Sequence, residues 1–415
     1  MSGHKKEIKM QKLPLANIRV LDFTQVRVGP QLTQWLAVMG AEVIRVETKL
    51  RPESFKMTGN PGNLTAPTKN RVGYFASLNY SKKSITINMK NPKAIDLVKE
   101  LLKHIDIVAE NFRTGVMERW GMGYDDLKKI NPGIILISAS GFGRTGPMKD
   151  EPAYAPVIDG FSGYAYINGY PDGEPAEAGA RGFSDSIGAF HGVYAVTAAL
   201  YHRSKTGEGQ FLDLSMSEAE LAFAPEAVIE YVTNGRVHER MGNRDITIAP
   251  HGCYRCKGED KWVAIAVSNE NEWTAFCKVI GNPGWAKDSK FKDVESRLNN
   301  QDELDGLIEN WTNKHDHLEA MKILQDAGVM AGASLNVQEM AADPQLNERG
   351  FLVDIEYPDK SKLRRLALPF NLSDSGRGQF THPPAAGEHN RYVFSELMGL
   401  SDEKIKELEQ EQVIY

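Results

Sequence analysis

Apolar residues in the first 220 positions of the chain follow two alternating patterns. Between several apolar runs, apolar side chains recur at helical spacing, and Pro30 and Pro92 suit the first turns of two such helices. The runs themselves are rich in β-branched and large apolar residues and predict buried strands at 18–24, 43–47, 84–89, 105–109 and 134–139. Alternating strands and helices of this kind predict an α/β domain built around a parallel sheet.

The pattern changes near residue 225. Before that point the remaining elements are two helices and a strand, expected at 117–130, 187–202 and 210–214. The segment 225–331 instead combines one strand with largely polar helices, at 262–267, 273–280 and 304–326. We therefore expect a large domain over 1–224, a smaller α+β domain over 225–331, and a further strand at 351–357 in the remainder.

Composition narrows the class of protein. The chain has 415 residues, of which 41% are hydrophobic and 25% charged, as in ordinary globular proteins. Its net charge of −6 gives no overall basic excess, so we expect neither nucleic acid nor an anionic membrane as the main partner. No stretch of about 18 apolar residues is present, and the basic N-terminal arm lacks the apolar segment of a secretory signal. Three cysteines suit a reducing compartment, and we expect a cytoplasmic protein.

Several familiar short motifs carry little weight in their sequence context. Gly141–Gly146 spells G-x-G-x-x-G, but no amphipathic helix follows it, so we interpret it as a glycine loop rather than a nicotinamide-cofactor site. Cys253 and Cys256 form a C-x-x-C pair, yet Cys277 stands alone and no second pair completes a zinc site; we expect packed thiols and no metal. His191 is interpreted as a packed helix histidine.

Asp185 is the carboxylate that the sequence singles out. It follows glycines at 179 and 182 and precedes a largely apolar helix. One interpretation is a helix N-cap, because Asp accepts hydrogen bonds from the exposed N–H groups of a helix start. The other is a nucleophile toward acyl groups, kept ionised by the positive helix end. The two interpretations are compatible.

Taken together, the ordered motifs resemble the class III CoA-transferases, the group that includes formyl-CoA:oxalate, carnitine and bile-acid CoA-transferases. The resemblance covers nearly the whole chain and rests on the segments 20–24, 29–30, 39–47, 106–112, 141–147, 205–210, 242–244, 249–252 and 327–329, together with the Asp185 loop. It implies a Rossmann-like large domain to which 332–415 return, a smaller domain, and two chains interlocked as a dimer. It also implies transfer of CoA from an acyl-CoA to a carboxylic acid through an aspartyl-CoA thioester.

The same resemblance assigns site residues. Asp185 matches the nucleophile, and coenzyme A is part of the substrate, with no permanently bound cofactor. The CoA contacts are carried over to Ile87, Asn88, Met89, Lys90, Asn111, Phe112, Arg113, Arg119 and Tyr154, with Arg113 standing where glycine is frequent. Arg27 replaces a glutamine of the formyl-CoA transferases, and an arginine there suggests a dicarboxylate such as succinate among the substrates. Thr48 replaces a CoA-contacting arginine, for which Lys49 or Arg51 are candidate substitutes.

Other functions within the same fold stay open at this level. The α-methylacyl-CoA racemases resemble this chain but use a Gly-His-Asp segment, whereas the matching segment here is Ala153-Tyr154-Ala155, which removes one of the two bases that racemisation needs. A silent partner subunit of a heteromeric transferase is the non-enzymatic alternative. The segment 25–31 looks similar to succinyl-CoA:(R)-benzylsuccinate transferase subunits of toluene breakdown. We favour an acyl-CoA:carboxylate CoA-transferase, as a homodimer or with a related subunit.

Overall fold

A computed structural model describes residues 13–50, 73–175 and 182–415. The basic N-terminal arm before Lys12 and the candidate Arg51 lie outside the described residues. The chain divides into two compact units. The first comprises Met1–Tyr164, Glu177–Asn234 and Glu348–Tyr415, and the second comprises Ala165–Ala176 and Gly235–Asn347.

A six-stranded parallel sheet forms the centre of the first unit, which confirms the expected α/β class. Its strands are β1 (Arg19–Asp22), β2 (Glu42–Glu47), β3 (Lys83–Thr86), β4 (Ile107–Glu110), β5 (Ile135–Ser140) and β6 (Phe211–Ser215). Their order is β3-β2-β1-β4-β5-β6, the order of the Rossmann fold. The order reverses between β1 and β4, and in sheets of this kind ligands bind beyond the carboxyl ends of the strands at such a point.

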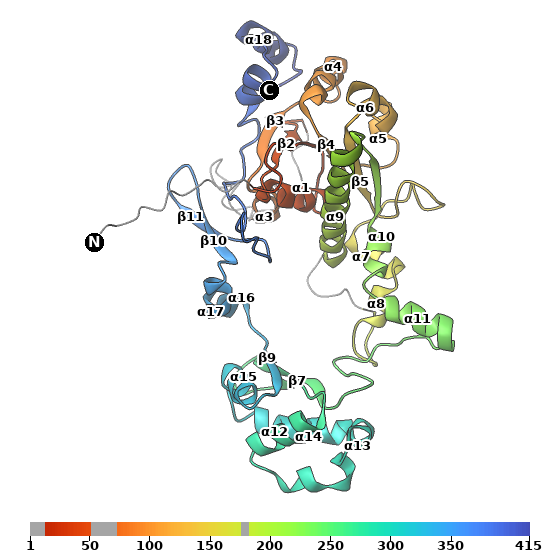
Figure 1. Ribbon diagram of the computed structural model, residues 1–415, viewed down its shortest axis with the longest axis vertical. Helices are drawn as coiled ribbons and strands as arrows, with labels where there is room; N and C mark the ends of the chain where they lie inside the picture. The colour runs from red at the N-terminus through yellow and green to blue at the C-terminus, as the bar shows by residue number, and fades with distance from the viewer. Residues whose placement is uncertain (1–12, 51–72, 176–181) are drawn as a thin grey trace, which may run out of the picture. The chain divides into compact units, whose positions relative to one another are not determined.

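Helices cover both faces of this sheet (Figure 1). On one face lie α1 (Val28–Val38) and α9 (Phe183–Thr206), and on the other lie α4 (Pro92–Leu101), α5 (Val116–Arg119) and α6 (Tyr124–Ile130). The alternation along β1 shows how both faces are filled: Val20 packs toward α1 and α9, and Leu21 toward α4. Further elements are α3 (Gly73–Asn79), η1 (Leu102–His104), α7 (Ala155–Phe161), α8 (Tyr164–Ile167), α10 (Met216–Leu221) and α11 (Pro225–Asn234).

The single helix expected over 117–130 is wrong. The chain forms α5 and α6 instead, and it leaves the helical conformation at Gly121, whose φ is 61°. A residue in the left-handed region ends a helix, so the apolar spacing of Met117 and Leu127 comes from two short helices that bury one face each.

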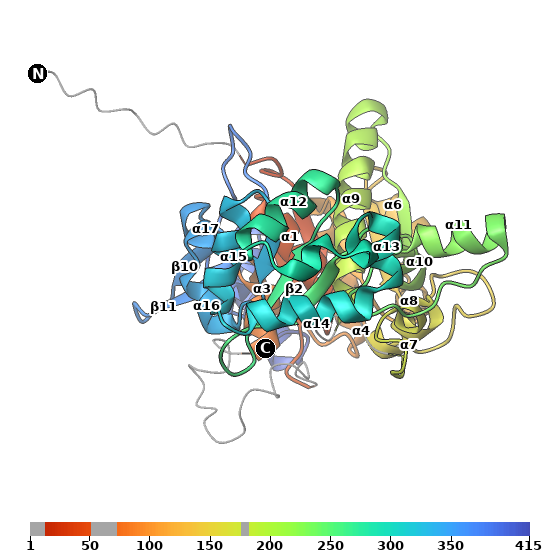
Figure 2. The same ribbon diagram turned by 90° about the horizontal axis from the view of Figure 1, so that it is seen from below.

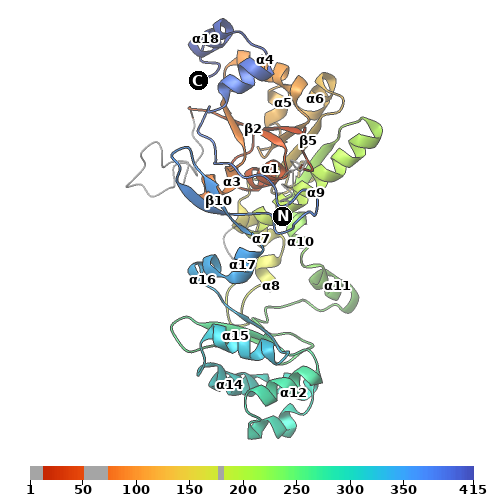
Figure 3. The ribbon, with the colours of Figure 1, turned by 60° about the vertical axis from the view of Figure 1, so that its left-hand side comes forward.

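The last part of the chain covers the free edge of β3. The N–H group of Thr86 donates to Asn390, the N–H group of His389 donates to the Ser84 carbonyl, and Ile87 forms a bridge with Ile414. Helix α18 (Asp402–Gln410) lies beside α4 (Figure 3). The remaining elements of this part are β10 (Leu352–Glu356), β11 (Lys362–Leu366) and the π-helical turn η4 (Tyr392–Leu397).

The second unit is a small α+β domain. Its antiparallel sheet has the order β7-β8-β9, with β7 (His251–Arg255), β8 (Trp262–Ala266) and β9 (Met330–Ala333). Three helices pack against this sheet, α12 (Glu270–Val279), α14 (Gln301–Thr312) and α15 (His317–Asp326), and all three are labelled in Figure 2. The remaining elements are η2 (Gly284–Lys287), η3 (Ser289–Phe291), α13 (Val294–Asn299), α16 (Val337–Ala342) and α17 (Pro344–Glu348). A boundary after residue 331 would cut β9, which pairs with β8, so the unit extends to Asn347.

The three cysteines are packed thiols in this second unit, as the sequence predicted. Cys256 and Cys277 are buried, and Cys253 is half-buried. Burial raises the pKa of Cys256 and of Cys277 to about 11, so both thiols stay protonated near neutral pH. No group of three or more metal-binding side chains occurs within the described residues. None of the described helices has the length and apolarity needed to cross a lipid bilayer.

Candidate active site

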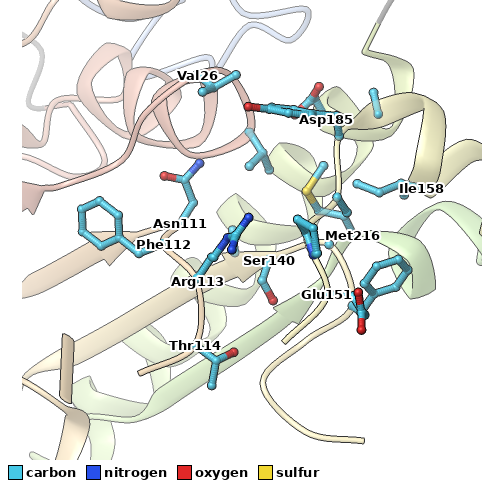
Figure 4. A pocket seen from close by; sticks show the side chains of 18 of the residues that line it. Val26, Asn111, Phe112, Arg113, Thr114, Ser140, Glu151, Ile158, Asp185 and Met216 are labelled. Carbon is cyan, nitrogen blue, oxygen red and sulfur yellow. The ribbon is translucent and has the colours of Figure 1, made fainter. Parts of the chain in front are cut away.

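A cavity of about 280 Å³ lies at the carboxyl ends of β1, β4 and β5 (Figure 4). Six of the residues singled out from the sequence line it, namely Arg27, Asn111, Phe112, Arg113, Tyr154 and Asp185. Figure 4 shows Asp185 at one side of this space and Asn111 and Phe112 at the other. The cavity therefore occupies the place where a sheet with this strand order binds ligands.

The loop after β1 is fixed by a buried carboxylate. Asp22 accepts hydrogen bonds from Thr24 Oγ1 and from Thr33 Oγ1, and Lys82 Nζ lies 3.0 Å from its Oδ2. Burial alone would raise the pKa of Asp22, but Lys82, Arg45 and the two hydroxyls outweigh it, and the pKa is lowered. The turn that carries Gln25 to Val28 into the cavity thus starts from a rigid anchor.

Val26 in this turn adopts a φ of 68°, which is rare for a β-branched residue. Strain of this kind persists only where the surrounding structure enforces it. The next residue, Arg27, stands at the N-cap of α1, and its Nη2 donates to Ser186 Oγ at 3.1 Å. Arg27 therefore joins the start of α1 to the start of α9 at the edge of the cavity.

The loop after β4 is tied to the loop after β1. Asn111 Nδ2 donates to the Gln25 carbonyl at 2.7 Å, and the Gln25 N–H donates back to Asn111 Oδ1 at 2.8 Å. Beneath it, Glu110 accepts from the Phe112 N–H and pairs with Arg144, which comes from the glycine segment 141–146. That segment leads into no helix before Ala155, as expected of a glycine loop. The amide of Asn111 thus serves the backbone as well as the cavity wall.

Asp185 does not cap its own helix. The N-cap of α9 is Gly182, and Asp185 is the third residue of the helix. Its carboxylate instead accepts a hydrogen bond from the N–H group of Val28, the first residue of α1. A free N–H at a helix start is a natural partner for a carboxylate, so Asp185 faces the N-terminus of the neighbouring helix.

Burial, more than the helix ends, sets the charge of Asp185. Its pKa is raised to about 6, because loss of solvent outweighs the lowering by the Arg27 guanidinium and by the Val28 N–H, and Asp159 raises it further. The sequence-based expectation that a helix start keeps this group ionised left out burial, which outweighs the hydrogen bond from the N-terminus of α1. Near pH 7 the carboxylate is mostly ionised, poorly solvated and close to the Arg27 guanidinium, a setting that makes a carboxylate reactive.

A second cavity of about 300 Å³ adjoins the first and shares Gln25 and Phe112 with it. It is lined by the whole segment assigned to CoA from the sequence, namely Ile87, Asn88, Met89 and Lys90, and by Thr48. Arg119 is exposed on α5 and lines neither cavity. Lys49 is also exposed, with its ammonium 5.5 Å from the ring centre of Tyr415.

Sequence reasoning missed part of the wall. Val26, Ser140, Ile158 and Met216 all line the first cavity. They are uncharged side chains on four different segments, and no motif joins them. Only the parallel sheet, which brings the ends of β5 and β6 beside those of β1 and β4, places them together.

Comparison with known proteins identifies the family. A family description, CoA-transferase family III, matches residues 15–390. The chain belongs to CoA-transferase family III. It is an enzyme that transfers coenzyme A between an acyl-CoA and a carboxylic acid.

The relatives of this CoA-transferase agree over nearly its full length. It is 33% identical to a succinyl-CoA–D-citramalate CoA-transferase of Chloroflexus aurantiacus, over 97% of this chain and 98% of the relative. It is 30% identical to the beta subunit of a succinyl-CoA–L-malate CoA-transferase of the same organism, again over 97% and 98%. A crystal structure of a CaiB/BaiF family protein from Brucella suis superposes with a TM-score of 0.85 at 30% identity, covering 93% of this chain and all of that one.

Proposed function

We propose that this CoA-transferase works through covalent catalysis by Asp185. The carboxylate attacks the thioester carbonyl of the donor, forming a mixed anhydride and releasing the CoA thiolate. The thiolate then attacks the aspartyl carbonyl of the anhydride, which expels the donor acid as its carboxylate and leaves an aspartyl-CoA thioester. The acceptor carboxylate attacks the aspartyl carbonyl of this thioester, which expels the CoA thiolate and forms a second mixed anhydride. The thiolate then attacks the acceptor's carbonyl carbon in this anhydride, which gives the new acyl-CoA and frees Asp185 as its carboxylate.

The observation that carries the proposal is the setting of Asp185. It is a carboxylate that lines the cavity, stays mostly ionised near neutral pH, and lies within the field of the Arg27 guanidinium. The guanidinium can stabilise the negative charge that develops on the attacked carbonyl oxygen. No histidine is among the cavity-lining residues that the structure describes, and the segment Ala153-Tyr154-Ala155 forms part of the wall, so nothing there favours a racemase with a histidine base.

Coenzyme A is proposed to extend from the second cavity into the first. Ile87 to Lys90 would hold its adenosine end, where the Lys90 ammonium can pair with phosphate oxygens. Phe112 lines both cavities, so the pantetheine arm would pass along its ring toward Asp185. Arg119 lies outside this path.

A dicarboxylate is proposed as one of the acids. Three cations, Arg27, Arg113 and Lys149, line the cavity that holds Asp185. A dicarboxylate has one carboxylate that takes part in the reaction and a second one that needs a cationic partner, which these side chains can provide. The relatives named above act with succinyl-CoA on hydroxylated dicarboxylates. A screen of succinyl-CoA and acetyl-CoA against succinate, citramalate, malate and (R)-benzylsuccinate, read by mass spectrometry, would identify the pair of acids.

The decisive experiment is the substitution Asp185→Asn. Asn keeps the size of the side chain but attacks acyl groups poorly, so we expect kcat to fall by at least about a thousandfold. Asp96→Asn, an exposed position on α4, is the matched control and should keep full activity. Wild-type protein mixed with donor acyl-CoA alone should gain a CoA-sized mass that hydroxylamine removes and that maps between Arg181 and His202.

Two outcomes would contradict this assignment. Retention of most transferase activity by Asp185→Asn would show that another group carries the acyl transfer. An adduct on Cys253, Cys256 or Cys277 would mean a thiol nucleophile.

A further inference from the structure

Two more carboxylates are buried beside the candidate active site. Asp159 belongs to α7 and Glu220 to α10, and their exposed fractions are 1% and 0%. The two helices pack against each other. Neither residue belongs to the nucleophile or to the CoA contacts assigned above.

Hydrogen bonding leaves these two carboxylates short of donors. Ser162 Oγ donates to Glu220 Oε2 at 2.9 Å. Asp159 Oδ1 and Glu220 Oε1 are buried and have no hydrogen-bond donor, and among the described residues neither carboxylate forms an ion pair. Ser162 Oγ also lies 3.2 Å from the backbone carbonyl oxygen of Asp159, which places the two acidic residues side by side. After burial, Asp159 raises the pKa of Glu220 both through its charge and through a side-chain hydrogen bond. Two carboxylates can bond in this way only when one of them carries a proton.

The charges that surround this pair are mostly negative. Helix α9 contributes Asp185 and α8 contributes the hydroxyl of Tyr164. The pKa of Tyr164 is raised first by burial and then by the charges of Glu220 and of Glu226 on α11. Arg27, at the start of α1, acts on Asp185. Burial first, and then Asp159, raise the pKa of Glu220 to about 7. A proton on the pair is therefore retained close to neutral pH.

The pair connects directly to the cavity wall. Ile158 precedes Asp159 on α7, and Met216 lies one turn before Glu220 on α10; both line the cavity with Asp185. The negative charge of Asp159 also raises the pKa of Asp185. The protonation state of the pair can thus affect Asp185 in two ways: through the packing of Ile158 and Met216 in the cavity wall, and through the negative charge of Asp159.

We propose that Asp159 and Glu220 are positioning residues that share one proton, and that this proton holds α7 against α10 so that the wall around Asp185 keeps its shape. When the pair loses the proton to solvent at alkaline pH, two like charges face each other in the interior and push the helices apart. The transferase should then lose activity although Asp185 itself stays ionised. The link to catalysis rests on the proposed role of Asp185, whereas the shared proton does not.

The test is the pH dependence of kcat. Wild-type kcat should fall about tenfold per pH unit above the pKa of the pair. Asp159→Asn and Glu220→Gln each leave one carboxylate and one amide, and the amide N–H group is a donor that does not titrate. The kcat of both variants should therefore change by less than about twofold across the same alkaline range. Glu218→Gln, an exposed position on the same helix α10, is the matched control and should keep the wild-type alkaline loss.

The acidic side of the profile separates the two variants. Asp159→Asn removes the charge that acts on Asp185, so the acidic loss of kcat should move to lower pH. Glu220→Gln leaves the full charge on Asp159, so the acidic loss should stay in place or move slightly upward. A purely structural role for the pair would change kcat without this asymmetry.

An infrared measurement tests the proton without turnover. At a pH where exposed carboxyl groups are ionised, the wild type should show the C=O stretch of one protonated carboxylic acid, shifted in heavy water and absent from Glu220→Gln. As the pH is raised, this band should disappear over the same range in which kcat falls. Both measurements use the wild-type protein, so the comparison does not depend on the folding of a variant. Absence of the band, or an alkaline loss that persists in both amide variants, would overturn the proposal. If the C=O band is present but Asp185→Asn keeps its activity, the shared proton is supported and only the assignment of Asp185 as the nucleophile is contradicted.

Discussion

At the residue scale, the half-buried carboxylate of Asp185 serves the proposed catalysis at a cost to the stability of the fold. Asp185 lines the cavity and interacts with the Val28 N–H group and the Arg27 guanidinium. These two interactions stabilise the ionised carboxylate less than the loss of solvent destabilises it. The sequence identified the residue because it lies in a glycine-rich loop at the start of a largely apolar helix and matches the nucleophile of the family that the chain resembles. The sequence could not give its pKa, which depends on burial and on Asp159, twenty-six positions earlier in the chain.

The ionised Asp185 carboxylate should lower the free energy of unfolding in a way that depends on pH. Because the pKa of Asp185 is raised to about 6 in the fold, its ionised form opposes folding above that pH, and the opposition disappears as the pH falls toward 4. Asp185→Asn should therefore raise the free energy of unfolding by about 2–3 kcal/mol at pH 8 and by almost nothing at pH 4. Urea unfolding of both proteins at the two pH values measures this.

The exposed Asp96→Asn variant serves as the control and should match the wild type at both pH values. A gain for Asp185→Asn that is equal at pH 4 and pH 8 would mean that side-chain packing, and not charge, stabilises it.

At the scale of elements, the start of α9 sets the position of the nucleophile. Gly182 has a φ of 85°, and a Cβ atom there would collide with the Arg27 guanidinium and lie 3.0 Å from Asp185 Oδ2. Gly207 at the other end of α9 has a φ of 77° and open space around it. The two glycines thus carry the same backbone demand, and only one adjoins the site.

Alanine at these two positions should separate strain from catalysis. Both Gly182→Ala and Gly207→Ala should lower the free energy of unfolding by about 1–2 kcal/mol, the cost of a left-handed alanine. Only Gly182→Ala should lower kcat, by about tenfold or more, because Arg27 and Asp185 must shift. Steady-state kinetics with thermal unfolding distinguish the two effects, and equal loss of kcat in both variants would rule out this role for the α9 start.

The sequence predicted elements better than it predicted contacts. The apolar runs located β1 to β5 to within a few residues, because a buried parallel strand is apolar on both faces. The spacing over 117–130 was misleading because two short helices in succession can give the apolar periodicity of one. Gly121 and Gly123 were the signals that the helix is interrupted. Asn111 was identified as a site residue, but its clamp onto Gln25 depends on strands 86 residues apart in sequence. Glu220, four residues after the buried Met216, was a charged residue on an apolar helix face and a signal left unused.

At the scale of the whole molecule, exposed apolar helices call for a partner. No residue of α11 is buried, although Ile229 and Val232 are apolar and 62% and 77% exposed. Tyr194 and Tyr201 on α9 are similarly exposed within the same unit. Apolar surface of this extent is typical of an interface. The resemblance to interlocked dimers leads us to propose a second copy of the chain, or a related subunit, as its cover.

Charged substitutions on these helices should break the assembly. We expect the wild type to have twice the mass of one chain in light scattering, and the combined variant Tyr194→Glu and Val232→Glu to shift toward the single mass with loss of activity. Lys128→Glu on the opposite face of the sheet is the control and should leave the mass unchanged. A wild type that runs as a single chain would refute the proposed dimer.

The cover over the edge of β3 has a consequence for biosynthesis. Strands β1 to β6 emerge from the ribosome early, but the segment that satisfies the backbone of β3 is translated only after the whole second unit. Until His389, Asn390 and Ile414 arrive, the nascent chain presents an open strand edge, which invites pairing with other chains. The smaller unit, contiguous apart from residues 165–176, can fold meanwhile. Cellular chaperones should therefore matter most during synthesis of residues 235–414, and proteins shortened before 387 should accumulate as aggregates.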